Sequence, residues 1–144
     1  MTADEKYMSI ALQEAQKALI KNEVPVGAII VSNDRIIARA HNQTEMLQDV
    51  TAHAEILAIT SAANYLGGKY LENCTIYVSL EPCAMCAGAL FWSKINRIVF
   101  GAYDKKRGFL SFNKDIVHPK TKVIGGILEE ECSVLIKDFF KTKR

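Results

Sequence analysis

Histidine and cysteine residues stand in two short segments of this 144-residue chain, at spacings that suit a metal ion. His53 is followed two positions later by Glu55, and Cys83 and Cys86 are three positions apart. Cysteine thiolates and a neutral imidazole are ligands that zinc favours. Cys83 and Cys86 can therefore converge on one metal ion, and His53 can supply a third ligand if the fold brings the two segments together.

The number of candidate ligands indicates the kind of metal site. A structural zinc ion is usually enclosed by four protein ligands, whereas a catalytic zinc ion keeps one position for water and can lower the pKa of that water toward about 7. The pattern thus predicts a hydroxide at neutral pH, with Glu55 as the candidate proton carrier. Residues two apart on a helix do not face each other, so His53 and Glu55 can share a site only if it lies over the helix end.

Hydrophobic periodicity predicts the elements that position these residues. A capping box of Thr2 and Glu5 begins the first helix. The strands and helices then alternate along the chain, an order that predicts one α/β domain over residues 1–144, with a mixed five-stranded sheet covered by helices on both faces in three α/β/α layers. The predicted helices are 2–22, 52–66, 82–93 and 129–140, and the predicted strands are 27–31, 35–40, 75–80, 97–100 and 122–124.

Composition excludes several classes of protein. Hydrophobic residues make up 49% of the chain and charged residues 24%, a balance that excludes a disordered or collagen-like chain. The longest stretch without a charged residue, 56–68, is shorter than the roughly 18 residues of a spanning helix. The first residues lack a secretory signal, so we expect a cytoplasmic protein without a membrane segment, whose four cysteines are thiols or metal ligands.

Positive charge is concentrated in one loop. The chain has a formal net charge of +2, whereas residues 101–122 hold six basic against two acidic residues. A loop this long in a compact domain is often functional, and a basic loop can attract a phosphate backbone. The alternative is a solvated loop without a partner, which is the commoner case for a run of charge.

The two metal-binding segments resemble the signature of the zinc nucleobase deaminases. That signature is His-x-Glu followed by Pro-Cys-x-x-Cys, and it is met here at 53–55 and 82–86. The similarity extends over nearly the whole chain to the bacterial tRNA adenosine deaminase family of the cytidine deaminase superfamily. The matching stretches are 23–28, 40–42, 51–55, 80–88, 97–102 and 138–140.

The resemblance implies a cytidine deaminase-like fold and a reaction. The implied reaction is hydrolytic deamination of adenosine to inosine at the wobble position of a tRNA anticodon. Glu55 would take a proton from the zinc-bound water and pass it to the ring and then to the departing amine. The implied ligands of one Zn²⁺ per subunit are His53, Cys83 and Cys86.

The resemblance also implies how the substrate is bound. Asn42 and Ala54 would contact the flipped-out nucleoside, and members of this family are homodimers that bind the tRNA anticodon loop. The loop after residue 102 carries basic residues interleaved with aromatic ones, which can hold phosphates and stack bases. The equal alternative is that the aromatic side chains attach the loop to the body of the protein. Its candidate RNA contacts are Asp104, Lys106 and Arg107, and its aromatic residues are Tyr103, Phe109 and Phe112.

Two alternatives stay open. The loop after residue 102 departs from the family's longer Gly-Ser-Leu pattern, so the same zinc site could serve a deaminase of a free nucleobase or nucleoside, of the guanine or cytosine type. A non-catalytic RNA-binding module would instead use a structural zinc ion with a fourth ligand from Cys74 or Cys132. Both of these cysteines are interpreted more simply as small buried residues.

Overall fold

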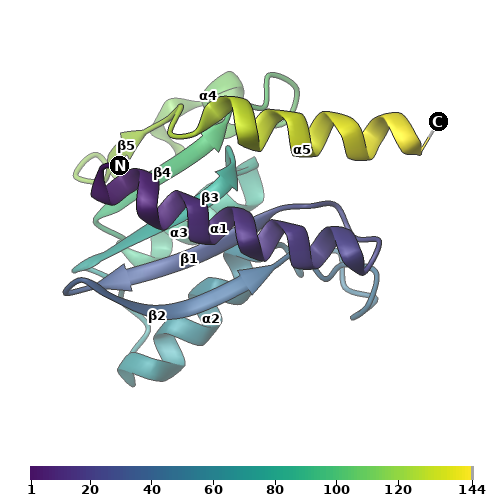
Figure 1. The fold of residues 1–144 in the computed structure, drawn as a ribbon. Helices are drawn as coiled ribbons and strands as arrows, with labels where there is room; N and C mark the ends of the chain where they lie inside the picture. The colour runs from purple at the N-terminus through teal and green to yellow at the C-terminus, as the bar shows by residue number, and fades with distance from the viewer. Residues whose placement is uncertain (144) are drawn as a thin grey trace.

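A mixed sheet of five strands forms the middle layer of the protein (Figure 1). The computed structural model describes residues 1–143, and the strands lie in the order β2-β1-β3-β4-β5. β1 pairs antiparallel with β2 and with β3, whereas β3, β4 and β5 run parallel. Their bounds are β1 Gly27–Ser32, β2 Arg35–His41, β3 Cys74–Leu80, β4 Arg97–Ala102 and β5 Lys122–Ile124.

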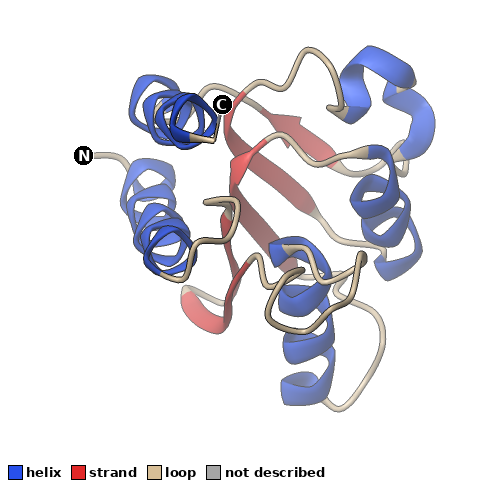
Figure 2. Ribbon diagram, turned by 90° about the vertical axis from the view of Figure 1, so that its right-hand side faces the viewer, coloured by secondary structure: helices blue, strands red, loops and turns tan. Residues whose placement is uncertain are grey.

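Helices cover both faces of this sheet, which confirms the predicted three-layer fold (Figure 2). α1 (Ala3–Ile20) and α5 (Glu129–Thr142) lie on one face, and α2 (Ala54–Leu66) and α3 (Ala84–Ser93) lie on the other. The long loop after β4 holds the short helix α4 (Phe109–Phe112) and a 3-10 turn over Lys114–Ile116. Within residues 1–143, none of the helices combines the length and the hydropathy that a membrane span requires.

Alternation along the central strands produces two hydrophobic cores. Successive side chains of a strand point to opposite faces of the sheet. On β1, Ala28 and Ile30 therefore pack in the core beneath α2 and α3, while Ile29 and Val31 pack against α1. Because both faces are covered, β1 and β3 are buried along most of their length.

Strand direction brings three loops to one edge of the sheet. β2 and β3 are both antiparallel to β1, and β4 is parallel to β3, so β2, β3 and β4 all end at the same edge. Asn42 follows β2, Glu81 follows β3 and Tyr103 follows β4. Loops at the carboxyl ends of parallel strands are where α/β proteins bind ligands.

Both site-bearing helices begin later than the sequence predicts. α2 begins at Ala54 rather than at residue 52, and α3 begins at Ala84 rather than at Pro82. Their N-cap residues are His53 and Cys83, which have extended backbones and make no side-chain capping bond. These two side chains are therefore free to turn toward the site instead of binding their own helix ends.

Candidate metal centre and active site

Three donor atoms meet where α2 and α3 begin. His53, Cys83 and Cys86 each offer one ligand atom, and these atoms lie within 4.8 Å of one another. Nδ1 of His53 is 3.5 Å from Sγ of Cys86 and 3.7 Å from Sγ of Cys83. Nitrogen and sulfur atoms that share a tetrahedral zinc ion are separated by roughly 3.6 Å, given zinc bonds of about 2.0 and 2.3 Å. The donor set therefore fits zinc in both chemistry and spacing.

The electrostatics of this group favour a cation. The hydrogen bond with Cys86, supported by one with His53, outweighs burial and lowers the pKa of Cys83 to about 4. The same contact with Cys83, together with burial, raises the pKa of Cys86. A buried thiolate needs a compensating positive charge, and both the N-terminal end of α3 and a divalent metal ion supply one.

Glu55 lies beside this group in the first turn of α2. It is almost completely buried, and burial raises the pKa of its carboxyl to about 7. A carboxyl group with a pKa near neutral can both accept and donate a proton in one catalytic cycle. His53 is the N-cap and Glu55 the second residue of the helix, so both reach the site over the helix end, as the sequence analysis requires.

The donor group opens into a cavity of about 340 Å³. This volume lies in the range of small-molecule binding sites and suits a nucleoside. Of the candidate metal, catalytic, substrate and polar RNA-contact residues, all but Cys86 and Lys106 line the cavity; Cys86 is buried in the donor group, and Lys106 is exposed to solvent. The three aromatic residues of the loop do not line the cavity. The lining residues are Val24, Val26, Asn42, Thr44, His53, Ala54, Glu55, Leu80, Glu81, Cys83, Asp104 and Arg107.

Asn42 is held in the cavity wall by its neighbours. Its side-chain amide donates to the carbonyl of Val24 at 3.3 Å, and its Oδ1 accepts from the N–H of Thr44 at 3.4 Å. Its backbone N–H donates to Val26. The side chain is thus placed at one wall of the cavity that Glu55 also lines.

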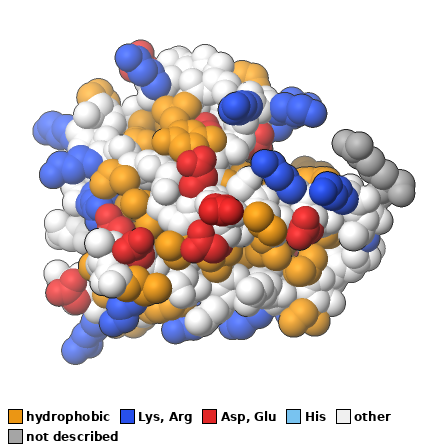
Figure 3. All heavy atoms as spheres, turned by 45° about the horizontal axis from the view of Figure 1, so that its top comes forward, with side chains coloured by type: hydrophobic (Ala, Val, Ile, Leu, Met, Phe, Trp, Pro, Cys, Tyr) orange, Lys and Arg blue, Asp and Glu red, His pale blue; other side chains and the backbone are white. Residues whose placement is uncertain are grey.

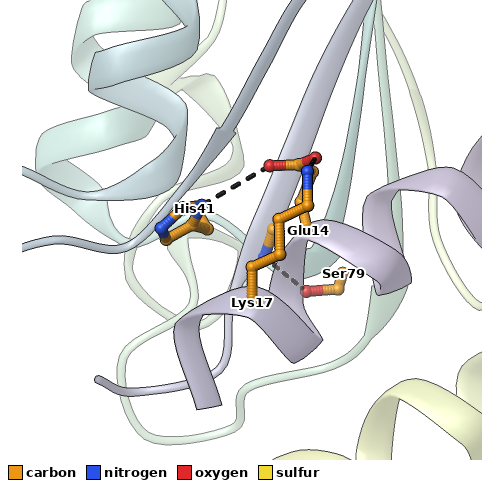
Figure 4. Close-up of polar contacts among 5 residues, drawn as sticks. Glu14, Lys17, His41 and Ser79 are labelled. Carbon is orange, nitrogen blue, oxygen red and sulfur yellow. Dashed lines mark hydrogen bonds and ion pairs between the residues drawn. The ribbon is translucent and has the colours of Figure 1, made fainter. Parts of the chain in front are cut away.

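His41, the neighbour of Asn42, belongs to a separate polar cluster on the α1 face. Nδ1 of His41 lies 3.4 Å from Oε1 of Glu14, and Lys17 donates to Oε2 of Glu14 at 2.7 Å. Figure 4 shows these side chains with Ser79, whose hydroxyl accepts from the N–H of Gly27. His41 is therefore not a residue of the cavity, and it ties the end of β2 to α1.

The aromatic residues of the basic loop do not form one stacking surface. Phe109 is completely buried in the core, so the expectation that it stacks on a base is wrong. The ring of Tyr103 packs edge-on against Phe100 with 4.9 Å between centroids. Phe112 remains more than half exposed and is the ring of the three most open to a partner.

On one face of the protein, basic side chains are spread out rather than gathered in one patch. On the face shown in Figure 3, Lys and Arg side chains lie mainly toward the edges, and Asp and Glu side chains lie across the middle. In the loop itself, Arg107 reaches the cavity while Lys106 points to solvent. Lys106 and Arg107 can therefore each meet a phosphate near the cavity.

Neither candidate for a fourth zinc ligand belongs to the donor group. Cys74 and Cys132 are buried free thiols outside the set of His53, Cys83 and Cys86. Two buried carboxylates near the cavity, Glu23 and Glu81, were missed by sequence reasoning. Their sequence signals are a charged residue beside an otherwise apolar segment and a place within the family-matching stretches 23–28 and 80–88.

Comparison with known proteins agrees with this geometry. The family model of the cytidine and deoxycytidylate deaminase zinc-binding region matches residues 1–102. A tRNA-specific adenosine deaminase of Bacillus subtilis is 46% identical over the whole chain and 92% of its own length. A solved structure from a study of tRNA:A34 deaminases is 41% identical, with a TM-score of 0.83 over 90% of this chain and 98% of that one.

A guanine deaminase structure from Bacillus subtilis is also similar. It is 35% identical, with a TM-score of 0.67, over 72% of this chain and 66% of its own. The match to the family model covers both the His-x-Glu and the Pro-Cys-x-x-Cys segments, whose donor atoms the fold brings together. The chain therefore belongs to the cytidine and deoxycytidylate deaminase family and carries that family's zinc-binding region.

Proposed function

We propose that this chain is a zinc-dependent hydrolase that deaminates adenosine to inosine at the wobble position of a tRNA anticodon. The observation that carries the proposal is the group of three donors beside Glu55, at the end of a nucleoside-sized cavity. Three protein ligands leave one position of a tetrahedral zinc ion free for water, as catalysis requires. The substrate is inferred from the full-length similarity to relatives named tRNA-specific adenosine deaminase.

The side chains of this site divide the chemistry between them. His53, Cys83 and Cys86 would hold zinc, which lowers the pKa of a coordinated water toward neutrality. The reaction joins the water oxygen to C6 of adenine and breaks the bond from C6 to the amino group, so that ammonia leaves. Glu55 takes the proton from the attacking water, gives it to the ring, and carries a second proton to the departing amine.

The walls of the cavity orient the nucleoside. Asn42 is fixed by bonds to Val24 and Thr44, so its amide can bind a polar group of the substrate without first losing conformational freedom. Ala54 is small and fully buried, which lets the substrate approach the first turn of α2 closely. Apolar contacts from Val26 and Leu80 would exclude water around the base.

Contacts with the surrounding RNA are assigned to the loop after β4. Arg107 lines the cavity and Lys106 is exposed beside it, so both can neutralise phosphates that flank the target. Asp104 also lines the cavity, and its carboxylate accepts the N–H groups of Lys106 and Arg107. It thereby orders the turn that presents the two basic side chains.

A homodimer in the cytoplasm is part of the same proposal. Large apolar side chains on α2 and α3 are exposed, among them Trp92, which is 76% accessible, and Tyr65. Exposed apolar surface of this kind is typical of an interface with another protein. Light scattering should give twice the mass of the chain, and a monomeric mass at assay concentration contradicts this part.

Deamination of a free nucleobase is the second candidate function. It is favoured by the similarity to the guanine deaminase structure and by the loop that departs from the tRNA deaminase pattern. The two functions predict different responses to salt. Binding of RNA weakens steeply as the salt concentration rises, because the release of counterions from the RNA becomes less favourable. Turnover of a free base should change little.

The deciding experiment compares substrates. A short RNA hairpin with adenosine at the wobble position is incubated beside free adenine, adenosine, guanine and cytosine, and products are identified by mass. We expect inosine in the hairpin and no turnover of the free compounds. Turnover of a free base with an unmodified hairpin overturns the tRNA assignment in favour of nucleobase metabolism.

A further inference from the structure

A buried carboxylate next to the zinc-binding segment takes no part in the chemistry described above. Glu81 follows β3 and is separated from Cys83 only by Pro82. It is 4% exposed, and among residues 1–143 it forms no ion pair with a basic side chain. A carboxylate that leaves water needs hydrogen bonds to compensate for its lost hydration, so its partners show what it does.

Those partners are two backbone N–H groups of the loop after β4. Oε1 of Glu81 accepts from the N–H of Asp104 at 3.0 Å, and Oε2 accepts from the N–H of Leu110 at 3.0 Å. Hydrogen bonds to an ionised acceptor are about twice as strong as neutral ones. Both oxygens of one side chain therefore fasten the two ends of the 104–110 segment, which we call the clasped loop.

The backbone around Glu81 supports the same attachment. The N–H of Glu81 donates to Ala102 at 2.8 Å, and the N–H of Phe109 donates to the carbonyl of Pro82 at 2.9 Å. A Cβ atom at Gly108 would lie 2.1 Å from Oε2 of Glu81, so a residue with a side chain does not fit there. Asp104, Gly108 and Leu110 of the loop therefore all lie against the carboxylate of Glu81.

The clasped loop forms part of the cavity wall. Asp104 and Arg107 line the same cavity as Asn42 and Glu55. The backbone N–H of Asp104 donates one of the two bonds to Glu81, and the carboxylate of Asp104 accepts from the N–H of Arg107 at 3.0 Å. The position of Arg107 relative to the zinc ligands therefore depends on the Glu81 carboxylate.

We propose that Glu81 is a positioning residue for substrate recognition. Its carboxylate holds the clasped loop against the segment that carries Cys83, and so fixes Arg107 at the cavity mouth in the geometry that binds RNA. The proposal rests on the proposed function, because the positioned residues would contact the nucleotides around the target adenosine. Glu81 also lines the cavity, but both of its carboxylate oxygens are occupied by the N–H groups of Asp104 and Leu110, so it affects binding through the loop and does not contact the reacting atoms.

The direct test replaces Glu81 with glutamine. Glu81→Gln keeps the size of the side chain but turns one acceptor into a donor that faces an N–H group. We expect hydrogen exchange at the Asp104 and Leu110 amides to accelerate about tenfold, and KM for the RNA hairpin to rise about tenfold, since a bond to a charged group is lost. Zinc content should stay at one per chain, and kcat should change much less than KM.

Glu72→Gln is the matched control, because Glu72 is an exposed glutamate outside the cavity. It should alter neither the exchange rates nor KM. Unchanged exchange and an unchanged KM in Glu81→Gln overturn the proposal. Loss of zinc, or a fall in kcat at constant KM, also overturns it, because either result makes Glu81 part of the metal centre or the chemistry.

A second variant reaches the same contact from the loop. Gly108→Ala forces a methyl group against the Glu81 carboxylate, so it should also raise KM and speed exchange at Leu110. Because the two changes disrupt one contact, the double variant should raise KM by less than the product of the single effects. Multiplicative effects overturn the proposal. If Glu81→Gln does not fold, Gly108→Ala alone carries the test, and an unchanged KM with unchanged exchange at Leu110 overturns the proposal.

The experiments distinguish a failure of the positioning role of Glu81 from a failure of the proposed deaminase function. If the wild-type chain does not deaminate the hairpin, the proposed function fails on its own. The exchange rates at Asp104 and Leu110 still report whether Glu81 holds the loop. If the wild-type chain is active and both variants bind the hairpin normally, only the positioning role is overturned.

Discussion

Gly27 is the position where one added methyl group should perturb the molecule most clearly. It begins β1 beneath α1, and a Cβ atom there would lie 2.1 Å from the carbonyl oxygen of Ala11 and 2.4 Å from the nitrogen of Ala15. These atoms belong to the backbone of a helix, so no rotation of a side chain relieves the overlap. To restore ordinary contact at about 3.4 Å, α1 would have to move more than about 1 Å away from the sheet.

The energetic cost follows from what this movement loosens. Overpacking a core typically costs 1–3 kcal/mol, and a clash with rigid backbone belongs at the upper end of that range. The movement also opens the contacts of the buried α1 residues Met8 and Ala15 and weakens the bond between Glu14 and His41. We therefore expect Gly27→Ala to lower the free energy of unfolding by about 3 kcal/mol.

Urea unfolding followed by far-UV circular dichroism measures this change. Gly68→Ala is the control, since a Cβ atom at Gly68 meets nothing within 4 Å and should change stability by less than about 0.5 kcal/mol. A loss below about 0.5 kcal/mol for Gly27→Ala as well would refute the close packing of α1 on β1. Val26, which precedes Gly27, and Asn42, which follows the β2 partner of Gly27, both line the cavity, so a folded variant should also bind substrate more weakly.

Three further predictions concern charge and metal. Burial would raise the pKa of the Asp4 carboxyl, but hydrogen bonds from Arg97 and Tyr77 outweigh it and hold this pKa below its ordinary value. The stabilisation from these bonds is therefore present above the unfolded-state pKa of Asp4 and is lost as pH falls through its folded-state pKa. Asp4→Asn should therefore lower Tm at neutral pH by a few degrees and much less in acid; an equal loss at both pH values contradicts the assignment. Arg107→Ala should raise KM for the RNA hairpin, with kcat little changed. It should also reduce the slope of the logarithm of the binding constant against the logarithm of the salt concentration by about one; an unaltered slope speaks against phosphate contact. Cys86→Ser should reduce zinc content well below one per chain by metal analysis, and full retention of zinc would exclude Cys86 as a ligand.

The metal centre could be predicted from sequence because it is built from two short segments, each of which holds its own residues close together. Cys83 and Cys86 are three positions apart, and His53 and Glu55 are two apart, so local helix geometry nearly determines how each pair is presented. The exact helix starts were not predictable from the pattern. Pro82 suits a first helical position, yet the helix begins two residues later, because Cys83 stays extended and turns its thiol toward His53.

The contacts made by the buried carboxylates could not be read from sequence. Glu81 binds N–H groups that lie 23 and 29 positions away, and Glu23 binds those of Glu45 and Met46. Backbone N–H groups carry no sequence signature, so such pairs become visible only when the loops are placed. Glu23 holds the loop after β2 and Glu81 the loop after β4, and residues of both loops line one cavity, which composition and periodicity do not indicate.

The burial of Phe109 was unpredictable for a related reason. It stands in a basic loop, where aromatic residues suit both RNA stacking and attachment of the loop to the core. The N–H of Phe109 bonds to Pro82, which turns the ring into the core beside α3. Asn42, by contrast, could be assigned from the resemblance, and it lies in the cavity wall while its neighbour His41 contacts Glu14 on the α1 face.

The measurement that tests the assigned chemistry most directly is turnover of the wobble-adenosine hairpin by Glu55→Gln, with zinc content determined on the same sample. Glutamine preserves the shape of the side chain but cannot carry the proton. We expect one zinc per chain, an unchanged fold, and turnover reduced by at least about 10²- to 10⁴-fold, the usual contribution of general acid and base catalysis. Undiminished turnover by a zinc-loaded Glu55→Gln would contradict the role of Glu55 and the mechanism built on it.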